Sequence, residues 1–261
     1  MTFDIRDSEK LAKDVCDLIK KASLFLNKEM SASSNDNNPS TNIDVEISDF
    51  LTKQLIGIID LPVISEESES QYKLLKGKFV WIIDPLDGTL NALTKNIPFC
   101  ISVSLLDLDI MEALFSCNYI PYNKQSYYAI KGKGAFLNNQ KISVSNFPQK
   151  IVSYGLPGDT IENIDFHLNH IKAILTGGYI SRQSGSAIHD ILMTALGKYH
   201  GFYEFGLFLW DFIGADLVAT ECGCKSFYKK SNKHNLNDLR YDYIIASDEE
   251  NLMILKDILN I

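Results

Sequence analysis

The sequence predicts a layered α/β fold in which helices flank mixed β-sheets. Two segments with apolar residues at helical spacing open the chain, strand-like segments predominate from about residue 99, and strands and helices alternate after residue 150. The 261 residues suffice for one large domain or two closely packed ones with a sizeable core. A hydrophobic content of 46% and a charged content of 22% are typical of a soluble globular protein.

The N-terminal segments predict two helices and a short strand. The first helix covers about residues 7–30, because its apolar positions recur at helical spacing: Leu11, Val15, Leu18, Ile19, Ala22, Phe25 and Leu26. A polar loop over residues 31–40 separates it from a second helix at residues 44–59. Thr41-x-x-Asp44 at the start of that helix is typical of helix capping. A strand at residues 62–65 then ends on Glu66 and Glu67, and a polar loop follows over residues 68–78.

The stretch Trp81-Ile82-Ile83-Asp84-Pro85-Leu86-Asp87-Gly88-Thr89 brings two acids together at a strand end. Residues 80–83 are apolar and predict a short buried strand that ends on Asp84, since Pro85 has no N–H for a ladder. Asp87 and Gly88 then favour a tight turn. Carboxylate oxygens at such a position suit Mg²⁺, and free backbone N–H groups after the glycine suit a phosphate. Turn chemistry alone is the alternative explanation for these residues.

The rest of the chain predicts further strands and then an alternation of strands and helices. Strands are expected at residues 100–108, 113–120, 127–130, 135–137 and 142–144. Beyond residue 150, we expect strands at 152–156, 179–182, 201–205, 225–228 and 243–246. Helices are expected at about 163–175, from 185 to 196, at 211–222 with Asp211 as the N-cap, and at 249–259.

Three acidic elements in a fixed order resemble the signature of the inositol monophosphatase-like family of metal-dependent phosphatases. They are Glu66-Glu67, then I-D-P-L-D-G-T at residues 83–89, then Trp210-Asp211. The resemblance covers nearly the whole chain, since Thr41-x-x-Asp44 and Gly185-Ser186-Ala187 fit it too. It implies a layered αβαβα sugar-phosphatase-type fold that is usually a homodimer. Residues 1–145 and 146–261 would be two halves of one compact catalytic unit.

The resemblance also implies a set of metal ligands. Glu66, Asp84 and the backbone carbonyl of Leu86 would hold one Mg²⁺, and Asp84, Asp87 and Asp211 would hold a second. Glu66 would lie near a third, weaker position, which makes two to three ions in all. Without metal, clustered carboxylates repel one another, so we expect their pKa values to be raised or the empty site to be loosely ordered.

Catalytic and substrate-binding residues follow from the same resemblance. Thr89 would pair with Asp44 and, together with Glu66, would orient a metal-bound water. Gly88 and Thr89 would give backbone N–H groups to the phosphate. Glu204 would accept a hydrogen bond from a hydroxyl of a cyclitol ring. The substrate-binding residues implied are Gly88, Thr89, Ala187 and Glu204.

Departures from the family pattern leave the substrate open. Leu90-Asn91-Ala92 keeps the asparagine of the usual Thr-Asn-Phe but loses the aromatic residue, and it lacks the Lys-Glu-Phe of nucleotide bisphosphatases. Ile213 stands where a small residue is usual, and Cys222-Gly-Cys224 replaces a more usual Ala-Gly-Gly. We expect myo-inositol 1-phosphate or a similar cyclitol or sugar monophosphate. The alternatives are 3′-phosphoadenosine 5′-phosphate, a sugar bisphosphate such as fructose 1,6-bisphosphate, histidinol phosphate, or a non-catalytic member that binds a partner.

Charge and cysteine content limit the partners and the compartment. The net charge of −8, from 25 basic and 33 acidic residues, argues against nucleic-acid binding through a broad basic face. No apolar run is long enough to span a bilayer, and the acidic N-terminus does not resemble a signal peptide. Five cysteines without a C-x-x-C pair argue against disulfides or a zinc site. We therefore expect a cytoplasmic protein whose partners are a small phosphorylated substrate and a second copy, without nucleic acid or membrane.

Overall fold

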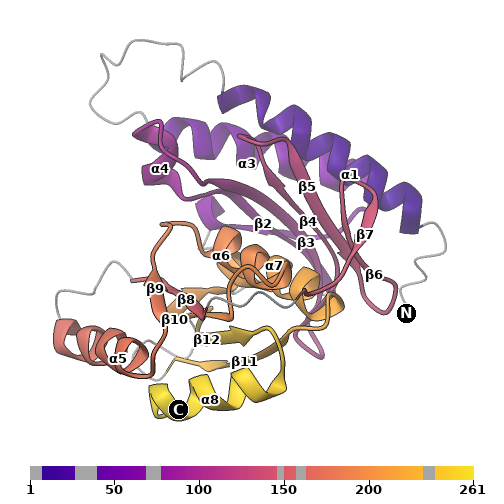
Figure 1. The fold of residues 1–261 in the computed structure, drawn as a ribbon. Coiled ribbons are helices and arrows are strands. Elements are labelled where there is room, and N and C mark those ends of the chain that lie inside the picture. Colours follow the sequence, from indigo (N-terminus) through magenta and orange to yellow (C-terminus); the bar gives the residue numbers. More distant parts are fainter. Residues whose placement is uncertain (1–7, 27–39, 69–77, 146–149, 157–162, 232–238) are drawn as a thin grey trace.

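Five alternating layers of helix and sheet make up the molecule (Figure 1). The computed structural model describes residues 8–26, 40–68, 78–145, 150–156, 163–231 and 239–261. Helices α1 and α3 form the first layer, a seven-stranded sheet the second, α6 and α7 the third, a five-stranded sheet the fourth, and α5 and α8 the fifth. This order confirms the predicted αβαβα fold with mixed sheets. Most of the predicted loops 31–40 and 68–78 lies outside the described residues.

The first sheet runs in the order β1 to β7, with β1 parallel to β2 and all other neighbours antiparallel. Its strands are β1 Val63–Ser65, β2 Phe79–Asp87, β3 Cys100–Asp107, β4 Glu112–Ile120, β5 Gln125–Ile130, β6 Gly134–Leu137 and β7 Gln140–Ile142. Helices α1 (Ser8–Ala22) and α3 (Ser40–Ile58) cover one face with their apolar sides. Trp81 and Phe115 are fully buried beneath them, so this face holds one of the hydrophobic cores.

The central helices are enclosed between the two sheets. Helix α7 (Leu209–Glu221) is buried from Leu209 to Ala219 except at Asp211, because it contacts strands of both sheets. Its sequence is accordingly apolar around almost its whole circumference. Helix α6 (Ala187–Ala195) packs beside it, and the short helix α4 (Thr89–Leu93) follows β2. The start of α6 and the end of β2 therefore meet between the sheets.

The second sheet has the order β11-β12-β10-β8-β9. Its strands are β8 Ile151–Tyr154, β9 Ile180–Arg182, β10 Gly201–Phe208, β11 Lys225–Lys230 and β12 Arg240–Ala246. Strands β9, β8 and β10 are parallel, and β12 runs antiparallel to both β10 and β11. Helices α5 (Ile164–Thr176) and α8 (Glu249–Leu259) pack on its outer face, and α8 has the bounds that the sequence predicted.

Two predicted helices at the N-terminus have different bounds. The helix expected at residues 7–30 ends at Ala22, where the Ser23 hydroxyl donates to Lys20 O at 2.8 Å and a turn interrupts the helix. Residues 24–26 are helical again, and 27–30 lie outside the described part. Helix α3 begins at Ser40 rather than at residue 44, so Asp44 lies inside the helix. The prediction that Asp44 stands at the helix start is therefore wrong.

Strand β2 continues through Pro85, against the prediction that the strand ends on Asp84. Asp84 pairs with Ser102 and Asp87 with Cys100, so three steps on β2 match two on β3. The extra residue makes a bulge. The missing N–H of Pro85 falls within this bulge, where the ladder is already interrupted.

Candidate functional site

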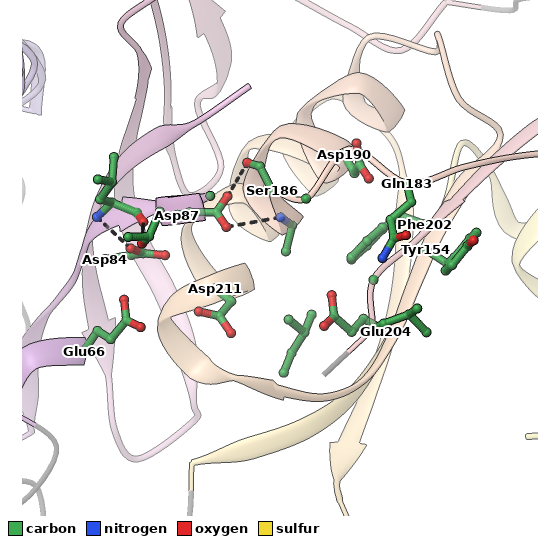
Figure 2. Close-up of a pocket in the computed structure, with 18 residues that line it drawn as sticks. Glu66, Asp84, Asp87, Tyr154, Gln183, Ser186, Asp190, Phe202, Glu204 and Asp211 are labelled. Carbon is green, nitrogen blue, oxygen red and sulfur yellow. Dashed lines mark hydrogen bonds between the residues drawn. The ribbon is translucent and has the colours of Figure 1, made fainter. Parts of the chain in front are cut away.

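A cavity of about 210 Å³ lies where the end of β2 meets α6, α7 and β10. All but one of the predicted site residues line it, namely Glu66, Asp84, Leu86, Asp87, Gly88, Thr89, Ala187, Glu204 and Asp211. Asp44, the remaining one, is buried in α3 and does not line the cavity. Figure 2 shows the carboxylates of Glu66, Asp84 and Asp211 gathered at one end and Glu204 at the other.

Three acids from three separate elements form the first end of the cavity. Glu66 is exposed at the turn after β1, Asp84 is buried in β2, and Asp211 lies in the first turn of α7. Burial, and then the charges of Glu66, Asp87 and Asp211, raise the pKa of Asp84 well above its usual value. Burial, and then Glu66, Asp87 and Glu204, do the same to the pKa of Asp211. These shifts agree with the pKa rise expected for the cluster without metal.

Asp211 stands at the third position of α7 and is not the predicted N-cap. Phe208 holds the N-cap position, and its backbone N–H donates to Asp211 Oδ2 at 3.0 Å. A carboxylate at the third position thus satisfies one of the unpaired N–H groups of the helix start. The other carboxylate oxygen of Asp211 is not bonded by Phe208, so the side chain can hold the helix and still present an oxygen to the cavity.

Asp87 ties the end of β2 to the start of α6. Its Oδ2 accepts the Ser186 hydroxyl at 2.5 Å and the Ile188 N–H at 2.9 Å, and its Oδ1 accepts the Ala187 N–H at 3.2 Å (Figure 2). Burial raises the pKa of Asp87 to about 6 against the opposing effect of these hydrogen bonds. The sequence analysis did not give Ser186 this role. The signal available for it was the N-cap preference of serine at the start of a helix.

Gly88 and Thr89 form the turn between β2 and α4. Gly88 has φ 85°, and a Cβ there would lie 2.9 Å from Pro98 O, so both the backbone conformation and the space require glycine. The Thr89 hydroxyl donates to Leu86 O at 2.8 Å. Leu86 O, a predicted metal ligand, thus already accepts one hydrogen bond. The pairing of Thr89 with Asp44 stays a prediction.

Asn91 joins the two halves of the site, and the sequence analysis noted it only as a residue that matches the family pattern. Its amide nitrogen donates to Pro98 O at 2.7 Å and to Ser184 O at 2.9 Å. Pro98 O is the atom that approaches Gly88, and Ser184 precedes the loop that leads into α6. One side chain thereby fixes the turn after β2 against the start of α6.

Glu204 forms the opposite end of the cavity. A Cβ at Gly155 would fall 1.6 Å from Glu204 Oε2, so glycine leaves the space that this side chain fills. Burial, and then the charges of Asp87 and Asp190, raise the pKa of Glu204 to about 8, against a smaller opposing effect of Arg240. The sequence analysis missed several residues that line the cavity, of which Tyr154, Gln183, Asp190 and Phe202 lie toward this end in Figure 2. They carry no motif, and only the folded chain brings them together.

The donor set fits divalent cations, although the side chains are not yet arranged around one. In the described part of the chain, no three His, Cys, Asp or Glu side chains form a group ready to hold a metal ion. Asp87 is turned toward α6, as its three hydrogen bonds require. The fit rests on chemistry: oxygen donors suit Mg²⁺, and the raised pKa values of Asp84 and Asp211 reflect burial first and crowded negative charge second. A bound cation would relieve that repulsion.

The fold is shared with solved structures. An inositol monophosphatase structure from Anabaena (Nostoc) sp. PCC 7120 superposes with a TM-score of 0.80 at 21% identity, covering 98% of this chain and 97% of that one. The sequence model of the family described as "Inositol monophosphatase family" matches residues 5–259 of this chain. The chain therefore belongs to the inositol monophosphatase family.

Curated relatives match over part of their length. A protein of Neisseria meningitidis serogroup B named "Putative Nus factor SuhB" is 36% identical over 165 residues, which is 62% of this chain and 62% of the relative. The "Inositol monophosphatase" of Dictyostelium discoideum is 37% identical over 149 residues, which is 55% of this chain and 54% of the relative. The chain thus matches somewhat more than half the length of these relatives. Across the described ranges, no helix has the length and apolarity that crossing a membrane demands.

Proposed function

We propose that the chain is an Mg²⁺-dependent phosphomonoesterase that hydrolyses a small phosphate ester, and membership of a phosphatase family supports this. One observation carries the proposal. Among the described residues that line the cavity, six are acidic and none is basic: Glu66, Asp84, Asp87, Asp190, Glu204 and Asp211. A site of that charge would repel a phosphate ester unless cations lie between them. The site therefore calls for metal ions.

Two to three Mg²⁺ ions would be held by the first end of the cavity. Glu66, Asp84 and Leu86 O are the proposed ligands of one ion, and Asp84, Asp87 and Asp211 of a second. Bound there, Mg²⁺ would neutralise the phosphate, activate water and stabilise the leaving alkoxide. The Asp87 carboxylate accepts hydrogen bonds from the start of α6. To bind the metal as well, it would need a lone pair that these hydrogen bonds do not use.

The protein's own groups would bind and orient the ester. The backbone N–H groups of Gly88 and Thr89 follow the carboxylates of β2 and are proposed to hold the phosphate. Thr89, with Glu66 and Asp44, is proposed to position the attacking water. The Thr89 hydroxyl now donates to Leu86 O, so in that role it would exchange this acceptor or accept from the water.

The far end of the cavity supports a hydroxylated leaving group. Glu204 and Asp190 lie there, and their side-chain oxygens are acceptors for ring hydroxyls. The metal-free pKa of about 8 makes Glu204 a neutral acid at pH 7, able to donate as well as accept. We propose myo-inositol 1-phosphate or a similar cyclitol or sugar monophosphate as substrate. The alternatives remain a 3′(2′),5′-bisphosphate nucleotide, fructose 1,6-bisphosphate or histidinol phosphate.

A non-catalytic role in binding a partner protein is the second candidate. It is suggested by the N. meningitidis relative, whose name describes a putative Nus factor rather than an enzyme. A homodimer and a cytoplasmic location also stay proposals. The five cysteines, all free and buried, support a reducing compartment.

Release of inorganic phosphate from a panel of esters tests the proposal. The panel comprises myo-inositol 1-phosphate, 3′-phosphoadenosine 5′-phosphate, fructose 1,6-bisphosphate, histidinol phosphate and an aryl phosphate, each with Mg²⁺ and with a chelator. We expect Mg²⁺-dependent turnover with the cyclitol ester preferred. A preference for another ester would overturn the substrate, and no turnover of any ester with Mg²⁺ would favour the partner-binding role.

A further inference from the structure

A second cavity, of about 660 Å³, lies away from the candidate catalytic site. The end of α1, residues 95–99 and the turn after β4 enclose it, and it shares no lining residue with the first cavity. Its size is that of pockets for small organic ligands. The lining residues are Lys20, Lys21, Ser23, Leu24, Leu26, Lys95, Asn96, Ile97, Phe99, Tyr119, Pro121, Tyr122 and Lys124.

Positive charge is concentrated in this cavity. Of the lining residues that the structure describes, four are charged and all four are lysines, although the chain carries a net charge of −8. Lys20 pairs with Asp17 at 3.6 Å, whereas Lys21, Lys95 and Lys124 form no ion pair with the residues that the structure describes. The lysines come from three separate segments of the chain, so the fold rather than a local run of charge brings them together. Such a cavity attracts an anion.

Apolar and aromatic side chains form the rest of the cavity. Phe99, Tyr119 and Leu26 are buried, whereas Tyr122 is 67% and Leu24 is 59% exposed. Exposed rings and aliphatic chains beside lysines suit a ligand with an apolar body and a charged end, because the body gains from burial while the charge meets the ammonium groups.

We propose that this cavity binds a small organic anion, namely a carboxylate, sulfonate or phosphate attached to an apolar or aromatic body. Lys21, Lys95 and Lys124 would contact the anionic group, and Tyr122, Leu24 and Ile97 would contact the body. The site differs in kind from the candidate catalytic cavity: no acid is found among the described residues that line it, so an anion is accepted directly rather than through metal.

Calorimetric titration of the full chain tests the proposal, with naphthalene-1-sulfonate as the anionic probe and naphthalene-1-sulfonamide as its uncharged counterpart. A chelator is present to keep the catalytic cavity free of metal. We expect one saturable site for the sulfonate and at least about fivefold weaker binding of the sulfonamide, since exposed charge pairs contribute modestly but several act together. Raising the salt concentration should weaken binding of the sulfonate but not of the sulfonamide.

Two double variants of equal charge change locate the site. Lys95→Gln/Lys124→Gln should weaken sulfonate binding about fivefold or more. Lys225→Gln/Lys229→Gln, on the exposed side of β11, removes the same charge elsewhere and should leave binding unchanged. Equal loss in both double variants, equal binding of the two probes, or no saturable heat would each overturn the proposal. A mass in solution that falls from dimer to monomer in Lys95→Gln/Lys124→Gln would also overturn it, by making a second copy the occupant.

Discussion

Glu204→Gln should change how the stability of the metal-free protein depends on pH. Burial and neighbouring acids raise the pKa of Glu204 from 4.5 to about 8 in the folded chain. Between these values the unfolded chain releases the proton and the folded chain retains it, so stability falls as pH rises. The loss begins above pH 4.5 and levels off above pH 8. Glutamine cannot ionise and mimics the neutral acid, so the variant avoids this loss.

The size of the effect follows from the two pKa values. Between pH 5 and pH 7.5 the linkage equation gives a loss of about 3 kcal/mol for wild type, at 1.36 kcal/mol per pKa unit. This is an upper value, because Glu204 is only partly buried and solvent screens the neighbouring charges. The free energy of unfolding of Glu204→Gln, relative to wild type, should therefore rise by about 3 kcal/mol or somewhat less over this range.

Urea unfolding at pH 5 and pH 7.5, in the presence of a chelator, measures the difference. The comparison with wild type cancels the contributions of all other groups that titrate alike in both proteins. Glu250→Gln, at an exposed position on α8, serves as the matched control and should follow wild type at both pH values. If Glu204→Gln and wild type differ by the same amount at pH 5 and pH 7.5, Glu204 ionises normally and the reasoning is refuted.

Three further substitutions test residues in and around the proposed metal and phosphate sites. Asp84→Asn should abolish turnover and remove the Mg²⁺-dependent rise in stability, which is about 2.7 kcal/mol at 100 times the Kd of the ion. Thermal unfolding with and without Mg²⁺ measures this rise. An unchanged rise in the variant would contradict the assignment of Asp84 as a metal ligand. Thr89→Ala should lower kcat by ~10²-fold with little change in KM, while Thr89→Ser stays near wild type; a raised KM with normal kcat would leave Thr89 a binding role only. Asn91→Ala should lose about 1–3 kcal/mol of stability because it leaves two carbonyls unpaired. The exposed control Asn123→Ala should lose much less in the same urea unfolding, and equal losses would rule out the bracing role of Asn91.

The predicted fold rested on periodicity, which is a local property of the chain. Alternating strands and amphipathic helices were visible for this reason and predicted a layered architecture, whereas the order of the five layers came from the family resemblance. The errors fall where tertiary context decides. Pro85 stays within β2 because a bulge removes the need for its N–H, and Asp211 lies inside α7 because Phe208 takes the N-cap position. Neither depends on a pattern that can be read within a few residues.

The predicted site rested on motifs that occupy a few consecutive residues. Asp84, Asp87 and Asp211 could be named because each sits in such a motif, and the structure brings all three to one cavity. Asn91 and Gly155 could not be given their roles. The first acts through carbonyls at Pro98 and Ser184, and the second through the space it leaves for Glu204. Such roles depend on contacts between segments distant in sequence.

The hydrogen bonds from α6 to Asp87 have a consequence for the order in which the chain folds during synthesis. They join residues about 100 positions apart, and the amide of Asn91 spans a similar separation to Ser184. Closing loops of this length costs chain entropy, and only the packing that forms later in folding offsets this cost. A growing chain that has completed only the first sheet carries Asp84 and Asp87 but lacks the partners that orient them. Competence to hold metal should therefore appear late in synthesis, after α6 and α7 have docked between the sheets, and metal loading would report that folding is complete.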